Sequence, residues 1–206
     1  MKRIILASGS SDRRALLERL AIQFNILITN VNEEEYENQF EDPIELVMKL
    51  AEVKVKKAKD FLKETSHPEM NDIIIAADTI VEYGGQIIGK AKNKDQAYII
   101  LKTLNNSTHN LITGITITQF NDSRIVTDFE RTRVTFMNLT NKEIQKYIDF
   151  GEWKGRAGAY SLFDKASMLI KKIEGSPSNV IGLPIQKIYY ILKNEFSINL
   201  MDLSRD

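Results

Sequence analysis

An apolar run at residues 4–7 passes directly into the small polar residues 8–11, and an amphipathic stretch follows at residues 15–20. This order predicts a short buried strand, a tight turn and a helix. Small side chains in the turn let the backbone approach an anion, and the free N–H groups at a helix start favour negative charge. Arg13 adds guanidinium donors that suit phosphate oxygens. The pattern predicts a phosphate cradle, although an ordinary serine N-cap has the same sequence.

The charge balance and the lack of cysteine exclude several classes of protein. The 206 residues include 28 Lys and Arg against 28 Asp and Glu, so no net charge is available to hold a polyanion such as nucleic acid. Without cysteine the chain forms neither disulfides nor thiolate zinc sites. No apolar run is long enough for a signal peptide or a membrane span. We therefore expect a soluble cytoplasmic protein with a small ligand, and neither nucleic acid nor membrane as a partner.

Helix and strand patterns alternate along the rest of the chain. The predicted helices cover residues 42–63, 94–104, 140–151 and 185–196. The predicted strands cover residues 72–81, 86–88, 110–120, 124–137 and 167–173, with turns at 84–85 and 121–123. This mixture of hairpins and helices predicts an α/β fold with a mixed sheet rather than a simple doubly wound one. Only residues 202–206 resemble a loose tail.

Asp78 closes the apolar run at residues 73–77 and is followed by further β-branched residues. A carboxylate inside a buried strand is costly unless it meets a metal ion or a cation, or serves in catalysis. A strand-end Asp that turns outward to cap a loop is the alternative. The position favours the functional interpretation.

Two lysines also occupy positions where the local pattern favours an apolar residue. Lys54 lies at helical spacing on the stripe of Val47, Leu50, Ala51, Ala58 and Phe61. Such a lysine either reaches the rim or an acid, or points into a phosphate pocket, and the sequence does not separate these cases. Lys90 ends the apolar segment 87–88 and by itself fits an ordinary edge-strand lysine.

An acidic run at residues 33–35 and one of the two histidines complete the candidates. Glu33 and its neighbours fit a solvated loop, but together with Asp78 they would supply the oxygen ligands that Mg²⁺ prefers. His109 precedes an apolar strand, where a structural role is the more common one.

Six motifs occur in order between residues 5 and 192. They are Leu6-Ala7-Ser8-Gly9-Ser10 with Arg13, Ala76-Ala77-Asp78-Thr79, Gly89-Lys90, Ser107-Thr108-His109 with Thr113-Gly114, Gly151-Glu152-Trp153 with Ala157-Gly158-Ala159-Tyr160, and Asn179-Val180-Ile181-Gly182-Leu183-Pro184. Together they resemble the Maf family of nucleoside triphosphate pyrophosphatases. The activity of that family cuts a nucleoside triphosphate between its α and β phosphates.

The resemblance implies a fold and a set of roles. It implies one domain over residues 1–200 and a tail at 201–206, with a mixed, largely antiparallel, elongated sheet flanked by helices. Two lobes would surround a central cleft, and two chains would form a homodimer. The resemblance makes Asp78 the base that deprotonates water and lets Ser8 and Arg13 hold phosphates. By the same resemblance, Lys54 and Lys90 neutralise charge, and Glu33 with Asp78 holds Mg²⁺ or Mn²⁺.

The chain departs from the family at positions that bear on the substrate. Family members commonly carry Pro-Arg or Pro-Trp where this chain has Ser11-Asp12, and Gln or Glu where it has Phe163. Thr79 matches the dTTP/UTP pattern. We expect Asp12 to weaken triphosphate binding unless it faces away or ligates the metal, and Phe163 to stack on a base with loose selectivity.

Two alternatives remain at this point. One is a nucleotide-binding regulator of cell division that kept the pocket and lost turnover. The other is a pyrophosphatase of the inosine triphosphate type, which shares a related architecture and reaction.

Overall fold

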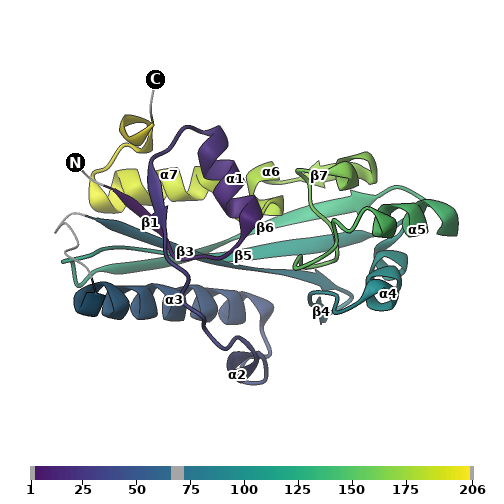
Figure 1. Ribbon diagram of the computed structural model, residues 1–206, viewed down its shortest axis with the longest axis horizontal. Coiled ribbons are helices and arrows are strands. Elements are labelled where there is room, and N and C mark those ends of the chain that lie inside the picture. The colour runs from purple at the N-terminus through teal and green to yellow at the C-terminus, as the bar shows by residue number, and fades with distance from the viewer. Residues whose placement is uncertain (1–2, 66–71, 205–206) are drawn as a thin grey trace.

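A mixed sheet forms the centre of the molecule. The computed structural model describes residues 3–65 and 72–204. Within these residues the strands pair in the order β2-β1-β3-β5-β6-β7, and β4 pairs with β3 outside that path. The strands are β1 Ile4–Leu6, β2 Phe24–Ile26, β3 Ile73–Tyr83, β4 Gln86–Ile88, β5 Thr108–Gln119, β6 Ile125–Phe136 and β7 Ile170–Glu174. Figure 1 shows an elongated sheet with helices on both faces.

The long strands β3, β5 and β6 pair antiparallel, while β1 pairs parallel with both β2 and β3. The turn between β3 and β4 lies at Gly84 and Gly85, which both have positive φ. Glycine adopts this conformation without a steric penalty, which is why the pair forms a tight hairpin turn. The observed sheet confirms the predicted mixed, largely antiparallel α/β fold.

Helices cover both faces and one end of the sheet. They are α1 Ser11–Arg19, α2 Glu34–Glu37, α3 Pro43–Thr65, α4 Lys94–Leu104, α5 Asn141–Asp149, α6 Pro177–Val180 and α7 Ile185–Phe196, with 3₁₀ turns η1 Lys165–Met168 and η2 Leu200–Leu203. Figure 1 shows α3 along one face, α1 and α7 on the other, and α4 and α5 at one end. Among the described residues, no helix has the length and apolarity needed to cross a membrane.

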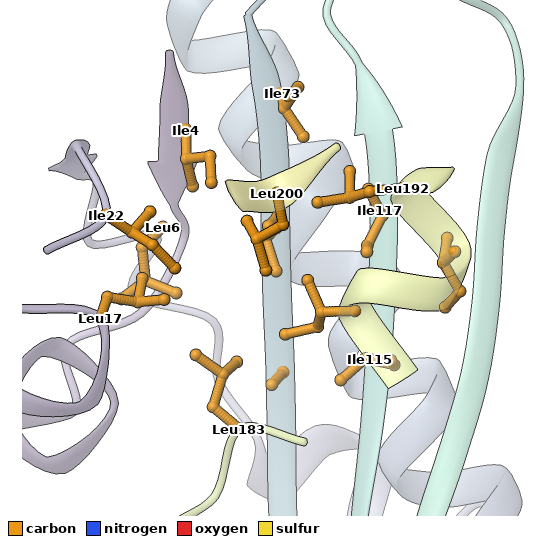
Figure 2. Close-up of a cluster of buried hydrophobic side chains, with 14 of the residues drawn as sticks. Ile4, Leu6, Leu17, Ile22, Ile73, Ile115, Ile117, Leu183, Leu192 and Leu200 are labelled. Carbon is orange, nitrogen blue, oxygen red and sulfur yellow. The ribbon is translucent and has the colours of Figure 1, made fainter. Parts of the chain in front are cut away.

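Two hydrophobic cores, the two largest of the four hydrophobic clusters among the described residues, lie toward opposite ends of the elongated sheet. One joins β1 and α1 to α7 and includes Leu6, Leu17 and Leu192 (Figure 2). The other joins α4 and α5 to the far ends of β5 and β6 and includes Leu101 and Phe136. Because the residues of each core come from distant parts of the chain, both ends of the sheet are tied to the same central strands.

The helix α3 approaches the sheet closely at Gly114 of β5. A Cβ atom added to Gly114 would lie 2.3 Å from the carbonyl oxygen of Val47 in α3, which is a severe overlap. Glycine is therefore required here by close backbone approach rather than by an unusual φ. Gly114 pairs directly with Asp78 of β3, so the close approach brings α3 over the strand that carries the candidate base.

The structure corrects the predicted chain end and one strand boundary. Leu200–Leu203 form η2, Leu203 packs against the first core, and Ser204 bridges to Ile22, so the expected tail is tied to the fold as far as Ser204. The remaining residues of that tail, 205–206, lie outside the described residues. The strand expected at 167–173 begins at Ile170, because Lys165–Met168 form a 3₁₀ turn instead.

Candidate active site

Most of the sequence motifs converge on one cleft of about 430 Å³. Its walls come from the turn between β1 and α1, from the middle of α3, from Asp78 and Thr79 on β3, and from residues 154–157. Six further predicted site residues also line it: Ser8, Asp12, Arg13, Glu33, Lys54 and Lys90. Residues that the chain separates widely therefore share one concave surface, as a binding site requires.

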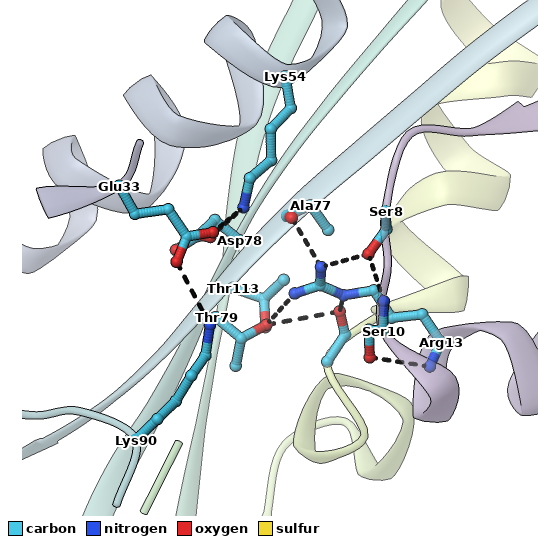
Figure 3. A network of polar contacts seen from close by, with 11 residues as sticks. Ser8, Ser10, Arg13, Glu33, Lys54, Ala77, Asp78, Thr79, Lys90 and Thr113 are labelled. Carbon is cyan, nitrogen blue, oxygen red and sulfur yellow. Dashed lines mark hydrogen bonds and ion pairs between the residues drawn. The ribbon is translucent and has the colours of Figure 1, made fainter. Parts of the chain in front are cut away.

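Four alternating charges form a row across the cleft (Figure 3). The Lys54 ammonium lies 2.5 Å from Asp78 Oδ1 and 2.7 Å from Glu33 Oε1. Lys90 Nζ lies 3.3 Å from Glu33 Oε2. Lys54 and Asp78 are buried, whereas the Lys90 side chain is 54% exposed. The row therefore runs from a buried acid to a cation in contact with solvent.

The environment moves the pKa values of the two carboxylates that share Lys54 in opposite directions. Burial raises the pKa of Asp78 even though Lys54 lies beside it. At Glu33 the desolvation from burial is outweighed by Lys54 and Lys90, which lower the pKa to about 2. Two nearby acids with pKa values moved in opposite directions are typical of sites that transfer protons. Asp78 is the better proton acceptor of the pair.

Arg13 is buried and uses most of its guanidinium within the protein. Nε donates to the carbonyl of Gly182 at 2.7 Å, and Nη1 donates to Ser8 Oγ and to the Ala77 carbonyl at 3.0 and 2.8 Å. Nη2 donates to Thr79 Oγ1 at 2.9 Å. A guanidinium has five N–H donors, so little of this one is left for phosphate. Arg13 joins three motifs of the sequence at the base of the cleft.

The serines of the turn after β1 fit both interpretations of the sequence, an N-cap and a phosphate cradle. Ser10 is the N-cap of α1, and its hydroxyl accepts a hydrogen bond from the backbone N–H of Arg13. The same turn, residues 8–11, lines the cleft. An N-cap and a phosphate cradle are compatible here, because capping satisfies one of the free N–H groups at a helix start and leaves others available.

Asp12 does not stand as an isolated negative charge. Arg156 donates from Nε to Asp12 Oδ2 at 2.9 Å and from Nη2 to Oδ1 at 2.7 Å, and Ser161 Oγ donates to Oδ2 at 2.9 Å. Arg156 also pairs with Asp164 at 2.8 Å. Asp12 is thus ion-paired in this structure, and the expectation that it weakens triphosphate binding stays a prediction.

Phe163 is the predicted site residue that lies apart from the others. It packs against the first hydrophobic core, and the guanidinium of Arg19 lies 5.0 Å from its ring centroid. It does not line the cleft formed by the described residues. Its apolar ring is accommodated by the core instead, which explains why Phe is tolerated where a polar residue is usual.

Sequence reasoning missed two basic residues of the cleft, Lys154 and Arg156. Both lie between the motif segments 151–153 and 157–160, which were recognised without them. The sequence signal that could have identified them is Lys154-Gly155-Arg156, in which two cations flank a glycine between two motif segments. Partners such as Asp12 lie far away in the chain, so local pattern alone did not identify their role.

His109 lies outside the cleft lining. Its Nε2 is 2.9 Å from the Tyr160 hydroxyl, and its ring packs edge-on against Phe136 and Tyr160. Burial lowers the pKa of His109 to about 4, so the imidazole is neutral near pH 7. This environment is that of a structural histidine.

The carboxylates of the cleft are too few to enclose a metal ion by themselves. The described residues contain no group of three or more His, Cys, Asp or Glu arranged to hold one. Glu33 and Asp78 fit a different case, since Mg²⁺ is commonly held by one or two carboxylates together with substrate phosphates. The donor set therefore fits a metal that arrives with a phosphorylated ligand.

Comparisons with known proteins agree with the motifs over almost the whole chain. A sequence model of the family described as Maf-like protein matches residues 3–195. The chain is 41% identical over 199 residues to a dTTP/UTP pyrophosphatase of Thermoanaerobacter sp. (strain X514), covering 97% of this chain and 100% of the relative. It is 41% identical over 201 residues to a dTTP/UTP pyrophosphatase of Alkaliphilus oremlandii, covering 98% and 100%. A third dTTP/UTP pyrophosphatase, of Bacillus cereus (strain G9842), is 38% identical over 200 residues, covering 97% and 98%. The chain belongs to the Maf-like protein family.

Proposed function

We propose that this protein is a nucleoside triphosphate pyrophosphatase that converts a (d)NTP and water to the (d)NMP and pyrophosphate, with dTTP and UTP among its substrates. The observation that carries the proposal is the buried Asp78–Lys54 pair beside the turn at residues 8–11, in one cleft. The names of the similar proteins support the same chemistry and the same substrates.

In this proposal Asp78 is the general base. Water attacks the α phosphorus, Asp78 accepts the proton, and the bond from that phosphorus to the bridging α–β oxygen breaks, so that pyrophosphate leaves. The raised pKa of Asp78 suits a proton acceptor, since efficiency increases as the pKa of the base approaches the working pH. Lys54 holds the carboxylate in place through its 2.5 Å contact.

The cations and the turn bind the polyphosphate. Lys90, with its exposed ammonium, meets negative charge that develops on the leaving pyrophosphate, and the backbone N–H groups of Gly9 and Ser11 in the turn hold other phosphate oxygens. Arg13 fixes this turn against β3, which makes it mainly a positioning residue. Phosphoryl transfer depends on such positioning and neutralisation more than on covalent help.

Mg²⁺ or Mn²⁺ is the proposed cofactor, and Glu33 and Asp78 would hold it together with the substrate. When bound, the metal supplies positive charge to the phosphates and lowers the pKa of water. We further propose a cytoplasmic homodimer, on the strength of the family resemblance. Light scattering on the purified chain tests the homodimer directly.

The decisive experiment is an assay of pyrophosphate release from a panel of canonical and modified NTPs. We expect turnover of several nucleotides, dTTP and UTP included, because Phe163 lies outside the cleft and the carboxylate of Asp12 is already ion-paired, so neither offers a free hydrogen-bonding group with which to reject a base. A protein that binds nucleotides without releasing pyrophosphate would instead be a regulator. An unpaired Asp12 would favour a regulator that turns over poorly, but Asp12 is paired with Arg156.

A further inference from the structure

The ion pair between Asp12 and Arg156 joins two walls of the cleft. Asp12 lies in the first turn of α1, directly after the turn that contains the proposed phosphate-binding N–H groups. Arg156 lies in the segment between α5 and η1 and also donates to the carbonyl of Glu152. The two residues are 144 positions apart in the chain, and both line the cleft.

The geometry of this pair is that of a fully engaged carboxylate. Both oxygens of Asp12 accept N–H groups of Arg156, and Ser161 adds a third donor. The side chains of Asp12 and Arg156 are 15% and 21% exposed, so solvent screens the pair less than it would on an open surface. A two-bond contact of guanidinium and carboxylate also fixes orientation, which a single lysine contact does not.

A free carboxylate at residue 12 would oppose a polyphosphate. The favourable field of a helix start is short-ranged, and a negative side chain in the first turn competes with a bound anion for the same N–H groups. Arg156 cancels that charge from the opposite wall of the cleft. It therefore allows this chain to carry an acid beside its phosphate-binding turn.

We propose that Arg156 is a positioning residue that neutralises Asp12 and so keeps the cleft receptive to the triphosphate. This inference rests on the proposed function, since it concerns the binding of the same substrate. It assigns Arg156 no contact with the reacting atoms. The residue acts through Asp12, and its effect is on KM rather than on kcat.

The test is a double-mutant cycle assayed with UTP and Mg²⁺. Arg156→Gln is expected to raise KM roughly tenfold with kcat within about twofold, because one uncompensated charge then faces the substrate. Asp12→Asn in the same chain is expected to restore KM to near the wild-type value. Added KCl is expected to shrink the KM defect of Arg156→Gln, since salt screens charge repulsion.

Asp164→Asn is the matched control. Asp164 forms the other ion pair of Arg156 and lies outside the cleft lining, so its removal disturbs Arg156 without uncovering Asp12. We expect an unchanged KM for this variant. A defect in Arg156→Gln that Asp12→Asn fails to rescue, or that salt does not alter, overturns the inference and indicates a purely structural contact.

Two further measurements keep the test conclusive. If Arg156→Gln fails to fold, the single variant Asp12→Asn decides, because the inference expects its KM to stay at or below the wild-type value, whereas a binding role for Asp12 itself raises it. Calorimetry with a UTP analogue whose α–β bridge resists hydrolysis separates the two proposals. Wild-type protein that neither binds this analogue nor releases pyrophosphate contradicts the proposed function, whereas wild-type turnover with an unaltered Arg156→Gln variant contradicts this inference alone.

Discussion

The ammonium of Lys54 lies 2.5 Å from a carboxylate oxygen of Asp78, and both side chains are buried. The two residues come from a helix and a strand that meet because Gly114 has no side chain to hold them apart. The acid therefore has its counter-charge in the absence of substrate. Removing either side chain leaves the other charge buried with fewer opposite charges beside it. We expect loss of Asp78 to lower turnover and loss of Lys54 to lower stability.

Asp78→Asn is expected to preserve the fold and to lower turnover by about 10²–10⁴-fold, the range associated with loss of a general base. The amide has nearly the same shape, and Lys54 keeps its contact with Glu33. Pyrophosphate release at saturating dTTP or UTP measures the effect, with circular dichroism to verify folding. Asp128→Asn, which removes a half-buried partner of Lys187, is the control. Near wild-type turnover in Asp78→Asn would remove Asp78 from the mechanism.

Lys54→Met is expected to destabilise the protein by about 3–5 kcal/mol at neutral pH, because Asp78 loses its buried counter-ion. The sequence alone left open a lysine that faces phosphate, for which stability would stay equal or rise. In the variant Asp78 binds its proton more tightly when folded than when unfolded, so the loss is small near about pH 4 and grows as pH rises. Urea unfolding at several pH values measures this dependence.

The controls for Lys54→Met use a neighbour and a second change. Lys63→Met alters an exposed lysine on the same helix and is expected to change stability little. Adding Asp78→Asn to Lys54→Met is expected to recover most of the lost stability, since no buried charge remains. A double variant as unstable as Lys54→Met alone would show that the lysine stabilises through packing instead.

His109 is expected to make the folded state sensitive to mild acid. Burial holds its pKa at about 4, so below about pH 6.5 the unfolded chain takes up a proton that the folded protein refuses. Stability is therefore present in full above about pH 6.5 and falls by about 2 kcal/mol on going to about pH 5. His109→Gln is expected to be less stable at neutral pH but to lack this part of the slope. Parallel pH profiles for the two proteins would contradict the assignment.

Gly114→Ala is expected to disrupt the contact between α3 and β5. The new methyl group would overlap the backbone of Val47, which cannot move aside as a flexible side chain can. We expect a loss of at least about 1–3 kcal/mol, the usual range for overpacking, or failure to fold. Gly89→Ala is the control, because no atom lies within 4 Å of a Cβ added there. Thermal unfolding of both variants measures the difference, and equal melting temperatures would contradict the role given to Gly114.

Removal of divalent metal is expected to abolish turnover without changing the stability of the nucleotide-free protein. The carboxylates of the described cleft are too few to hold the ion alone, so the metal binds with the substrate. Assays in EDTA followed by added Mg²⁺ or Mn²⁺ measure the first effect, and thermal unfolding with and without EDTA measures the second. Full turnover in EDTA would contradict the metal requirement. A lower melting temperature in EDTA would indicate a metal site within the chain.

The sequence by itself was enough to predict the strands of the sheet except β2, and most of the cleft. Asp78 and Lys54 were identified because each interrupts an apolar pattern whose period predicts burial, and burial of a charge demands a partner. The turn at residues 8–11 was identified because small residues between a strand and a helix have a local meaning. These signals depend on neighbours within a few positions, which is why periodicity recovers them.

Only the tertiary structure decided which charges meet. Lys54 finds Asp78 and Glu33 through the packing of α3 on the sheet, and Asp12 finds Arg156 across 144 residues. The tertiary structure also packs Phe163 against the first core rather than in the cleft. The local sequence pattern predicts that a charged side chain is buried, but it does not identify the partner of that charge. The partner is set by long-range strand pairing and helix packing, and these determine whether the free energy of a buried charge is compensated.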